Sequence, residues 1–230
     1  MAWLFLVFTG LVVAGIAAAI VRYLDKGRRK IALLVLAAWV LYTGSLGFSG
    51  MLANPTAVPP RIALILIPVL LGALFLAGSD AGRDLALSIP VSLLIGAQMF
   101  RVIVELFIHQ FWSAGLLPKM LTYEGANFDI VAGLSAPVVA WLIASRRLSS
   151  RLALAWNVFG LVLLANIVVR AILTTPALQA LVTEVPNRAL GMFPFTFIPG
   201  LMAPLALTLH VLAIRALLAG ARAERAPQPL

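Results

Sequence analysis

Apolar residues occupy most of the chain in long runs that short polar connections separate. Each run approaches the ~20 residues that a transmembrane helix needs. The pattern predicts an all-α fold, a bundle of seven transmembrane helices in a single domain at 1–220, followed by a short disordered cytoplasmic tail at 221–230. We expect the longest segment, the fourth, to tilt, protrude or kink near Pro90. The seven segments are 2–22, 31–49, 62–79, 85–112, 130–145, 152–173 and 193–214.

Composition places this pattern in a membrane. The chain is 63% hydrophobic and 11% charged, and its mean hydropathy is +1.07. These values lie well outside the range of water-soluble domains, so we expect an integral membrane protein. The absence of cysteine excludes disulfides, thiol catalysis, iron–sulfur clusters and thiolate zinc sites.

The basic residues predict the orientation. Cytoplasmic loops carry an excess of Lys and Arg, so we expect the N-terminus outside and the C-terminus in the cytoplasm. The bases form short runs between apolar segments instead of one patch, which favours the lipid bilayer as partner and argues against nucleic acid. Most of the 17 bases fall on the cytoplasmic side in this arrangement: Arg22, Lys26, Arg28, Arg29, Lys30, Arg83, Arg146, Arg147, Arg151, Arg215, Arg222 and Arg225.

The fourth segment carries a polar stripe. Gln98, Arg101, Glu105 and His109 follow at spacings of three and four, which place them on one face of a helix. Ionisable groups at bilayer depth are costly, so they face a protein interior and commonly mark a functional site. The same face continues through apolar residues toward Asp84, which predicts polarity in the outer half of the membrane and a dry inner half.

The sixth segment adds Asn166 and Arg170, one turn apart and at similar depth, and the second adds Tyr42 and Ser45. We therefore predict an outward-facing polar pocket walled by the second, fourth and sixth segments and covered by the loops 113–129 and 174–192. The six candidate ligand-binding residues are Gln98, Arg101, Glu105, His109, Asn166 and Arg170.

The charges of this expected pocket favour one class of ligand. Arg101 and Arg170 against Glu105 leave a net positive charge, and Arg binds carboxylate or phosphate oxygens in a fork. This favours binding or transport of a small polar, possibly anionic, molecule. Two alternatives remain: an intramembrane enzyme acting on a lipid-like substrate with Glu105 and His109 as acid–base pair, or a sensor or structural subunit in which Arg101 and Glu105 form a purely structural pair.

Other residue patterns argue against cofactors. The two histidines, His109 and His210, are expected at different membrane depths, so they cannot share a haem or a metal ion. No lysine falls in the last segment, which excludes a retinal Schiff base. In the loop before the fifth segment, Asn127 or Asp129 is expected to cap the following helix. The sequence thus predicts no cofactor.

Several short runs in the second half of the chain have the pattern of a known family. They are Leu117-Pro118, Met120-Leu121-Thr122-Tyr123-Glu124-Gly125, Asn127-Phe128-Asp129-Ile130, Gly133, Trp156-Asn157, Gly160-Leu161, Asn166-Ile167-Val168, Glu184-Val185-Pro186-Asn187, Phe193-Pro194 and the stretch from Pro204 to His210. From about residue 98 onward the chain thus resembles an uncharacterised family of small bacterial multi-pass membrane proteins. The resemblance implies a bacterial cytoplasmic (inner) membrane, and it supplies neither substrate nor catalytic residues.

Overall fold

A computed structural model describes residues 1–54 and 60–223, and every regular element in these ranges is helical. Part of the expected disordered tail, residues 224–230, lies outside the described residues. The α-helices are α1 (Ala2–Tyr23), α2 (Lys26–Phe48), α3 (Ala63–Gly78), α4 (Asp80–Ser88), α5 (Val91–Gly96), α6 (Phe100–Ser113), α7 (Asp129–Ala144), α8 (Ser150–Leu173) and α9 (Ala203–Ala223).

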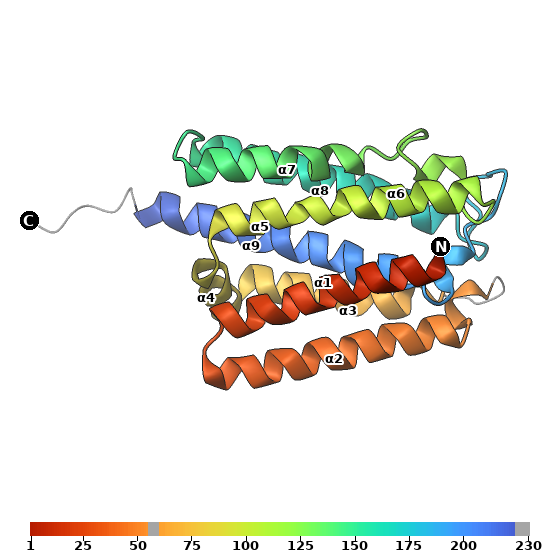
Figure 1. Cartoon of the computed structure of the whole chain (residues 1–230), viewed down its shortest axis with the longest axis horizontal. Coiled ribbons are helices and arrows are strands. Elements are labelled where there is room, and N and C mark those ends of the chain that lie inside the picture. Colours follow the sequence, from red (N-terminus) through yellow and green to blue (C-terminus); the bar gives the residue numbers. More distant parts are fainter. Residues whose placement is uncertain (55–59, 224–230) are drawn as a thin grey trace, which may run out of the picture.

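The long helices lie side by side along a common axis, so that the connections gather at the two ends of the bundle (Figure 1). Helices α1 and α2 pack together along one side, and α7 and α8 pack together along the other. Helix α9 is the central element, because it packs against α3, α4, α5 and α8. The candidate site forms around its N-terminal half.

Five helices in the described part of the chain are long and apolar enough to cross a membrane. They are α1, α2, the continuous rod Val91–Ser113, α8 and the rod Ile198–Gly220. The pair α3 and α4 makes a sixth if it counts as one span, and α7, with 16 residues, is shorter. The protein is therefore an apolar helical bundle with five or six candidate membrane spans.

The fourth predicted segment is not one helix, which corrects the expected boundaries 85–112. Helix α4 ends at Ser88, and a new rod begins at Val91 after Pro90. Proline lacks an N–H and disfavours helical backbone at the residue before it, so the chain breaks there. The expected continuous face down to Asp84 does not exist. Asp84 instead binds Arg28 at 3.3 Å at the end of the bundle.

Helix α4 turns across the end of the bundle. Its axis is bent by 80° from that of α3, and Ser79 joins the two helices. The Ser79 hydroxyl accepts a hydrogen bond from the N–H of Gly82 at 3.1 Å, which caps the start of α4. Arg215 of α9 donates to the carbonyls of Leu76 and Ser79 at 2.6 Å each, so the end of α3 is held against the central helix.

A π-helical turn, η5 (Ile198–Met202), leads into α9. Pro204 has no N–H to donate to the carbonyl of Gly200 four residues earlier. Trp39 of α2 supplies the missing donor, and its indole Nε1 binds that carbonyl at 2.6 Å. The proline therefore creates an attachment point for a neighbouring helix, as is common where helices break inside membranes.

The same arrangement recurs one turn further along α2. Pro68 cannot donate to the carbonyl of Leu64 in α3, and Tyr42 donates its hydroxyl to that oxygen at 3.0 Å. Two aromatic donors on one helix thus satisfy two carbonyls that prolines leave free. Tyr42, which we expected in the wall of the pocket, instead attaches α2 to α3.

Two apolar clusters position the site along the rods. One contains Val104 and Ile108 with Ile198, Leu201 and further residues, and the other contains Leu94 and Ile95 with Leu212 and Ala213. Arg101 of α6 and His210 of α9 lie between these clusters in sequence. The polar groups are therefore enclosed by packed apolar side chains on both sides.

Candidate functional site

Arg101 is the centre of a buried polar cluster. Two nitrogens of its guanidinium donate hydrogen bonds to the carboxylate of Asp129 at the start of α7. Nε donates to Oδ2 at 2.7 Å, and Nη2 donates to Oδ1. Nη2 also donates to the carbonyl of Gly160 at 3.4 Å. Only 2% of Arg101 is exposed. Arg101 and Glu105 do not form the expected structural pair. The guanidinium instead binds the carboxylate of Asp129 on the neighbouring helix α7 in a two-point contact.

Close helix packing brings Arg101 and Asp129 together. A Cβ on Gly133 of α7 would lie 2.9 Å from the backbone nitrogen of Val102, so only glycine lets the two helices approach this closely. Asp129 stands in the first turn of α7, where the helix dipole favours negative charge. Its backbone N–H donates to Oδ1 of Asn127 at 2.9 Å. Asn127 thus satisfies the first N–H of α7, although the N-cap residue is Phe128 and neither of the two expected capping residues takes that position.

His210 of α9 extends the cluster. Nη1 of Arg101 lies 3.0 Å from Nε2 of His210, and an arginine can only donate, so Nε2 is an acceptor. The ring proton therefore sits on Nδ1 and is donated to Oδ1 of Asn157 at 2.9 Å. Asn157 donates in turn to the carbonyl of Ala153 at 2.9 Å. The imidazole is neutral and is held by hydrogen bonds at both nitrogens.

Glu105 differs from Arg101 and Asp129 in its hydrogen-bond partners. It is 2% exposed, and Oε2 accepts a hydrogen bond from Nδ2 of Asn127 at 2.6 Å. The same Asn127 nitrogen also donates to the carbonyl of Leu121 at 3.0 Å. Across residues 1–54 and 60–223, no protein group donates to Oε1 of Glu105, and no base forms an ion pair with its carboxylate.

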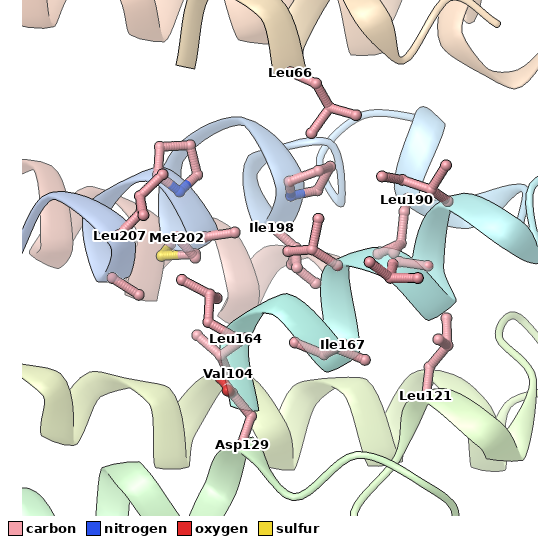
Figure 2. Close-up of a pocket in the computed structure, with 18 of the residues that line it drawn as sticks. Leu66, Val104, Leu121, Asp129, Leu164, Ile167, Leu190, Ile198, Met202 and Leu207 are labelled. Carbon is pink, nitrogen blue, oxygen red and sulfur yellow. The ribbon is translucent and has the colours of Figure 1, made fainter. Parts of the chain in front are cut away.

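A cavity of about 450 Å³ lies beside this cluster. Figure 2 shows its apolar side chains converging from α3, α6, α8 and the start of α9, with Asp129 at one edge. Arg101, Glu105 and Asp129 are its only charged lining residues among those that the structure describes. The apolar lining residues that the figure labels are Leu66, Val104, Leu121, Leu164, Ile167, Leu190, Ile198, Met202 and Leu207.

The walls of the cavity differ from the expected ones. Helices α3 and α9 take the place of α2, which does not line the cavity. Both expected covering loops contribute: Leu117 and Leu121 come from the first, and Asn187 and Leu190 from the second. The site is thus an apolar cavity with a polar edge, where the sequence predicted a polar pocket.

Three of the six predicted site residues do not line the cavity. Gln98 donates to the carbonyl of Ala206 at 3.0 Å, and its buried Oε1 has no partner. Asn166 and Arg170 bind each other at 2.9 Å, and Asn166 also holds the carbonyl of Ala126 at 2.8 Å. None of the three lines the cavity.

His109 lies at the surface end of α6. Its Nε2 is 2.8 Å from Oε1 of Glu124, and its ring stacks on Tyr123 with a centroid distance of 4.8 Å. It does not line the cavity either. Of the six predicted residues, Arg101 and Glu105 are therefore the two that the fold places in the cavity wall.

Sequence reasoning missed Asp129, Asn157 and His210 as members of the cluster. His210 was expected in the inner half because the last helix was taken to begin at residue 193, whereas the rod runs over Ile198–Gly220. Position 209 is the middle of that rod, and position 102 is the middle of Val91–Ser113, so Arg101 and His210 share one depth. Asp129 was interpreted as a helix cap, and its ion pair with Arg101 was therefore not predicted.

The polar cluster does not resemble a metal centre. Among the described residues, no group of three or more His, Cys, Asp and Glu side chains is arranged to hold a metal ion. The carboxylate of Asp129 is already bound to Arg101, and the neutral His210 has both nitrogens occupied. What remains available to a ligand is the cavity itself and the free oxygen of Glu105.

The comparisons with known proteins give a family and no activity. The model of a family described as "Domain of unknown function (DUF8737)" matches residues 59–218. The match includes the region of the expected resemblance, extends it toward the N-terminus as far as α3, and leaves α1 and α2 outside. No curated protein and no solved structure matches the chain.

Proposed function

Since the chain belongs to the family of this domain of unknown function (DUF8737), we propose its function from the cavity: it binds a mostly apolar molecule with one polar end, within the outer half of a membrane. The observation that carries the proposal is the cavity of about 450 Å³, apolar except at one edge. Its size lies within the ~300–1,000 Å³ of small-molecule sites, which are likewise apolar with a few placed polar groups.

The lining also indicates how a ligand enters. Leu70 of α3 and Val169 of α8 border the cavity, yet 55% and 51% of their respective surfaces are exposed. Both belong to membrane-facing helix surfaces, so the cavity reaches the bilayer between α3 and α8. The loops carrying Leu117 and Leu190 cover it toward the outer end. A molecule that already resides in the lipid has the shortest path into such a site.

The proposed ligand is mostly apolar and so differs from the small polar, possibly anionic, molecule that the sequence favoured. Arg101 already holds a carboxylate, so an anion would have to displace Asp129 to use the guanidinium. The enzymatic alternative gains no support, because His109 binds Glu124 at the surface instead of meeting Glu105 in the cavity. Binding or movement of an amphipathic molecule agrees with both observations.

We also propose that the bundle crosses the bilayer seven times, with an outside N-terminus, in a bacterial cytoplasmic membrane. In support, α3 and α7 run alongside the longer rods (Figure 1). The end of α1, the start of α2, helix α4, the α7–α8 connection and the end of α9 gather at one end of the bundle. These are the segments that carry most of the bases, which favours that end as the cytoplasmic one.

A cavity-filling variant tests the proposed function. Leu164 is buried in the cavity wall, so Leu164→Trp places a large ring in the space that the ligand requires. Val162→Trp is the matched control, because it adds the same ring on the same helix at a position that is 60% exposed and outside the lining. Molecules that copurify with the protein in nanodiscs are identified by native mass spectrometry.

We expect a bound lipid-like molecule in the wild type and in Val162→Trp, and its loss in Leu164→Trp. The thermal stabilisation that an added ligand gives should disappear in parallel, because a molecule that binds only the folded state raises its stability. Equal occupancy in all three proteins would show that the cavity is not the binding site.

A further inference from the structure

Resting on the proposed function, we infer that the polar end of the ligand is a cationic amine, and that Glu105 is the residue that selects it. The ligand class is thus a lipophilic ammonium: an apolar body in the cavity and an N–H-bearing cation against the Glu105 carboxylate. The inference stands on three features of the cavity wall: its free hydrogen-bonding atoms, its charge and its apolar remainder.

The free polar atoms of the wall are both acceptors. Oε1 of Glu105 receives no hydrogen bond from the described residues, although the side chain is 2% exposed and lines the cavity. Oδ1 of Asn187 is likewise buried without a partner and belongs to the same lining. The orientation of Asn187 follows from its Nδ2, which donates to the carbonyl of Ala171 at 2.9 Å. Such atoms call for a ligand that donates.

Among ligand groups that can donate a hydrogen bond, the charge of the wall favours a positively charged one. Of the three charged lining residues, Arg101 and Asp129 neutralise each other in a two-point ion pair. Glu105 remains, and its one hydrogen-bond partner, the amide of Asn127, carries no charge. A buried carboxylate without a counter-ion is costly, and an arriving ammonium supplies the missing positive charge. A carboxylate or phosphate end would instead be repelled.

The apolar remainder of the wall favours an amine over a metal ion as the ligand. Metal cations such as Ca²⁺ and Mg²⁺ require about six or more oxygen ligands. The cavity offers apolar side chains from α3, α8 and α9 around Glu105, which suit a hydrocarbon body and not a hydrated ion. An alcohol donates to Oε1 as well, but it brings no positive charge to compensate the buried carboxylate, as an ammonium does.

Three probes with the same hydrocarbon chain test the inference: dodecylammonium, dodecanol and dodecanoate. Each is titrated into the full-length protein in phosphatidylcholine nanodiscs, and Kd is taken from the concentration dependence of thermal stabilisation. The wild type is expected to bind dodecylammonium about tenfold or more tightly than dodecanol, with dodecanoate weakest. This comparison needs no variant, so it remains decisive if a substitution impairs folding.

Variants then assign the selectivity to one residue. Glu105→Gln keeps the shape and is expected to reduce the preference for dodecylammonium over dodecanol to about threefold or less. Glu124→Gln, which removes a surface carboxylate that does not line the cavity, is the control and should keep the full preference. Comparing variants in the same bilayer cancels the different partitioning of the probes into lipid.

The outcomes separate the two proposals. If dodecanol binds as well as dodecylammonium, or if Glu105→Gln retains the preference, the amine assignment is overturned and the apolar cavity stands. If none of the probes binds, and Leu164→Trp changes no copurified molecule, then the cavity itself is not a binding site and both proposals fail.

Discussion

The contact between Gly160 and His210 makes the buried cluster sensitive to a single methyl group. A Cβ on Gly160 would lie 2.6 Å from Nε2 of His210, far inside the ordinary contact distance of 3.4–4 Å. In Gly160→Ala the imidazole must therefore move by most of an ångström. That movement lengthens its hydrogen bonds to Arg101 and Asn157, which are 3.0 and 2.9 Å long.

The expected cost follows from three contributions. Overpacking a filled interior typically destabilises by about 1–3 kcal/mol. Two interhelical hydrogen bonds inside a membrane contribute roughly 0.6 kcal/mol each, so their loss adds about 1 kcal/mol. Alanine in place of glycine in a helix returns about 1 kcal/mol. We therefore expect Gly160→Ala to lower the free energy of unfolding by about 1–3 kcal/mol.

Equilibrium unfolding with sodium dodecyl sulfate in mixed micelles measures this difference. Gly72→Ala in α3 is the matched control, since a Cβ there meets nothing within 4 Å, and it should be neutral or slightly stabilising. In a His210→Ala background the clash is absent, so the added methyl should cost nothing. A Gly160→Ala protein as stable as Gly72→Ala, or an equal cost with and without the imidazole, would refute the packing described for this cluster.

Two further predictions concern contacts outside the cavity. Trp39→Phe should destabilise by roughly 0.6–1.7 kcal/mol because the carbonyl of Gly200 loses its donor, and Pro204→Ala should remove most of that cost by restoring a backbone N–H; equal costs in both backgrounds in the unfolding assay would contradict this. Between the loops 113–129 and 174–192, the backbone N–H of Lys119 donates to Glu184 at 2.6 Å and lowers the pKa of that carboxyl below 4.5. The contact is thus complete above pH 4.5 and lost as the pH falls through the lowered pKa, and a carboxyl NMR titration giving 4.5 or more would show that the loops do not meet.

The sequence was sufficient for the helices that hydrophobicity defines. Runs of apolar residues locate α1, α3, α7 and α8 closely at both ends, because a helix inside a membrane must be apolar over its whole length. It was insufficient where a local break decides the outcome. Pro90 separates α4 from the next rod, and the late start of the last rod at Ile198 shifts every residue behind it in depth.

The candidate site was predictable in part for the same reason. Arg101 and Glu105 stood out because charged residues rarely occur in apolar helices. Their partners did not, because Asp129 sits at a helix start, where a carboxylate has an ordinary explanation, and its pairing depends on the three-dimensional approach of two helices at Gly133. The apolar character of the cavity was equally hidden, since α3 and α9 supply part of its wall, and neither helix carries a polar stripe.

The bond from Trp39 to the carbonyl of Gly200, four residues before Pro204, joins the matched domain to a part of the chain outside it. The matched domain begins at residue 59, so the indole comes from a helix outside it while the proline lies within it. The two positions are expected to covary: sequences that share this domain and lack the preceding hairpin should replace the proline, or provide another donor for that oxygen. The residue at the position of Pro204 is therefore expected to depend on whether the helices α1 and α2 precede the domain.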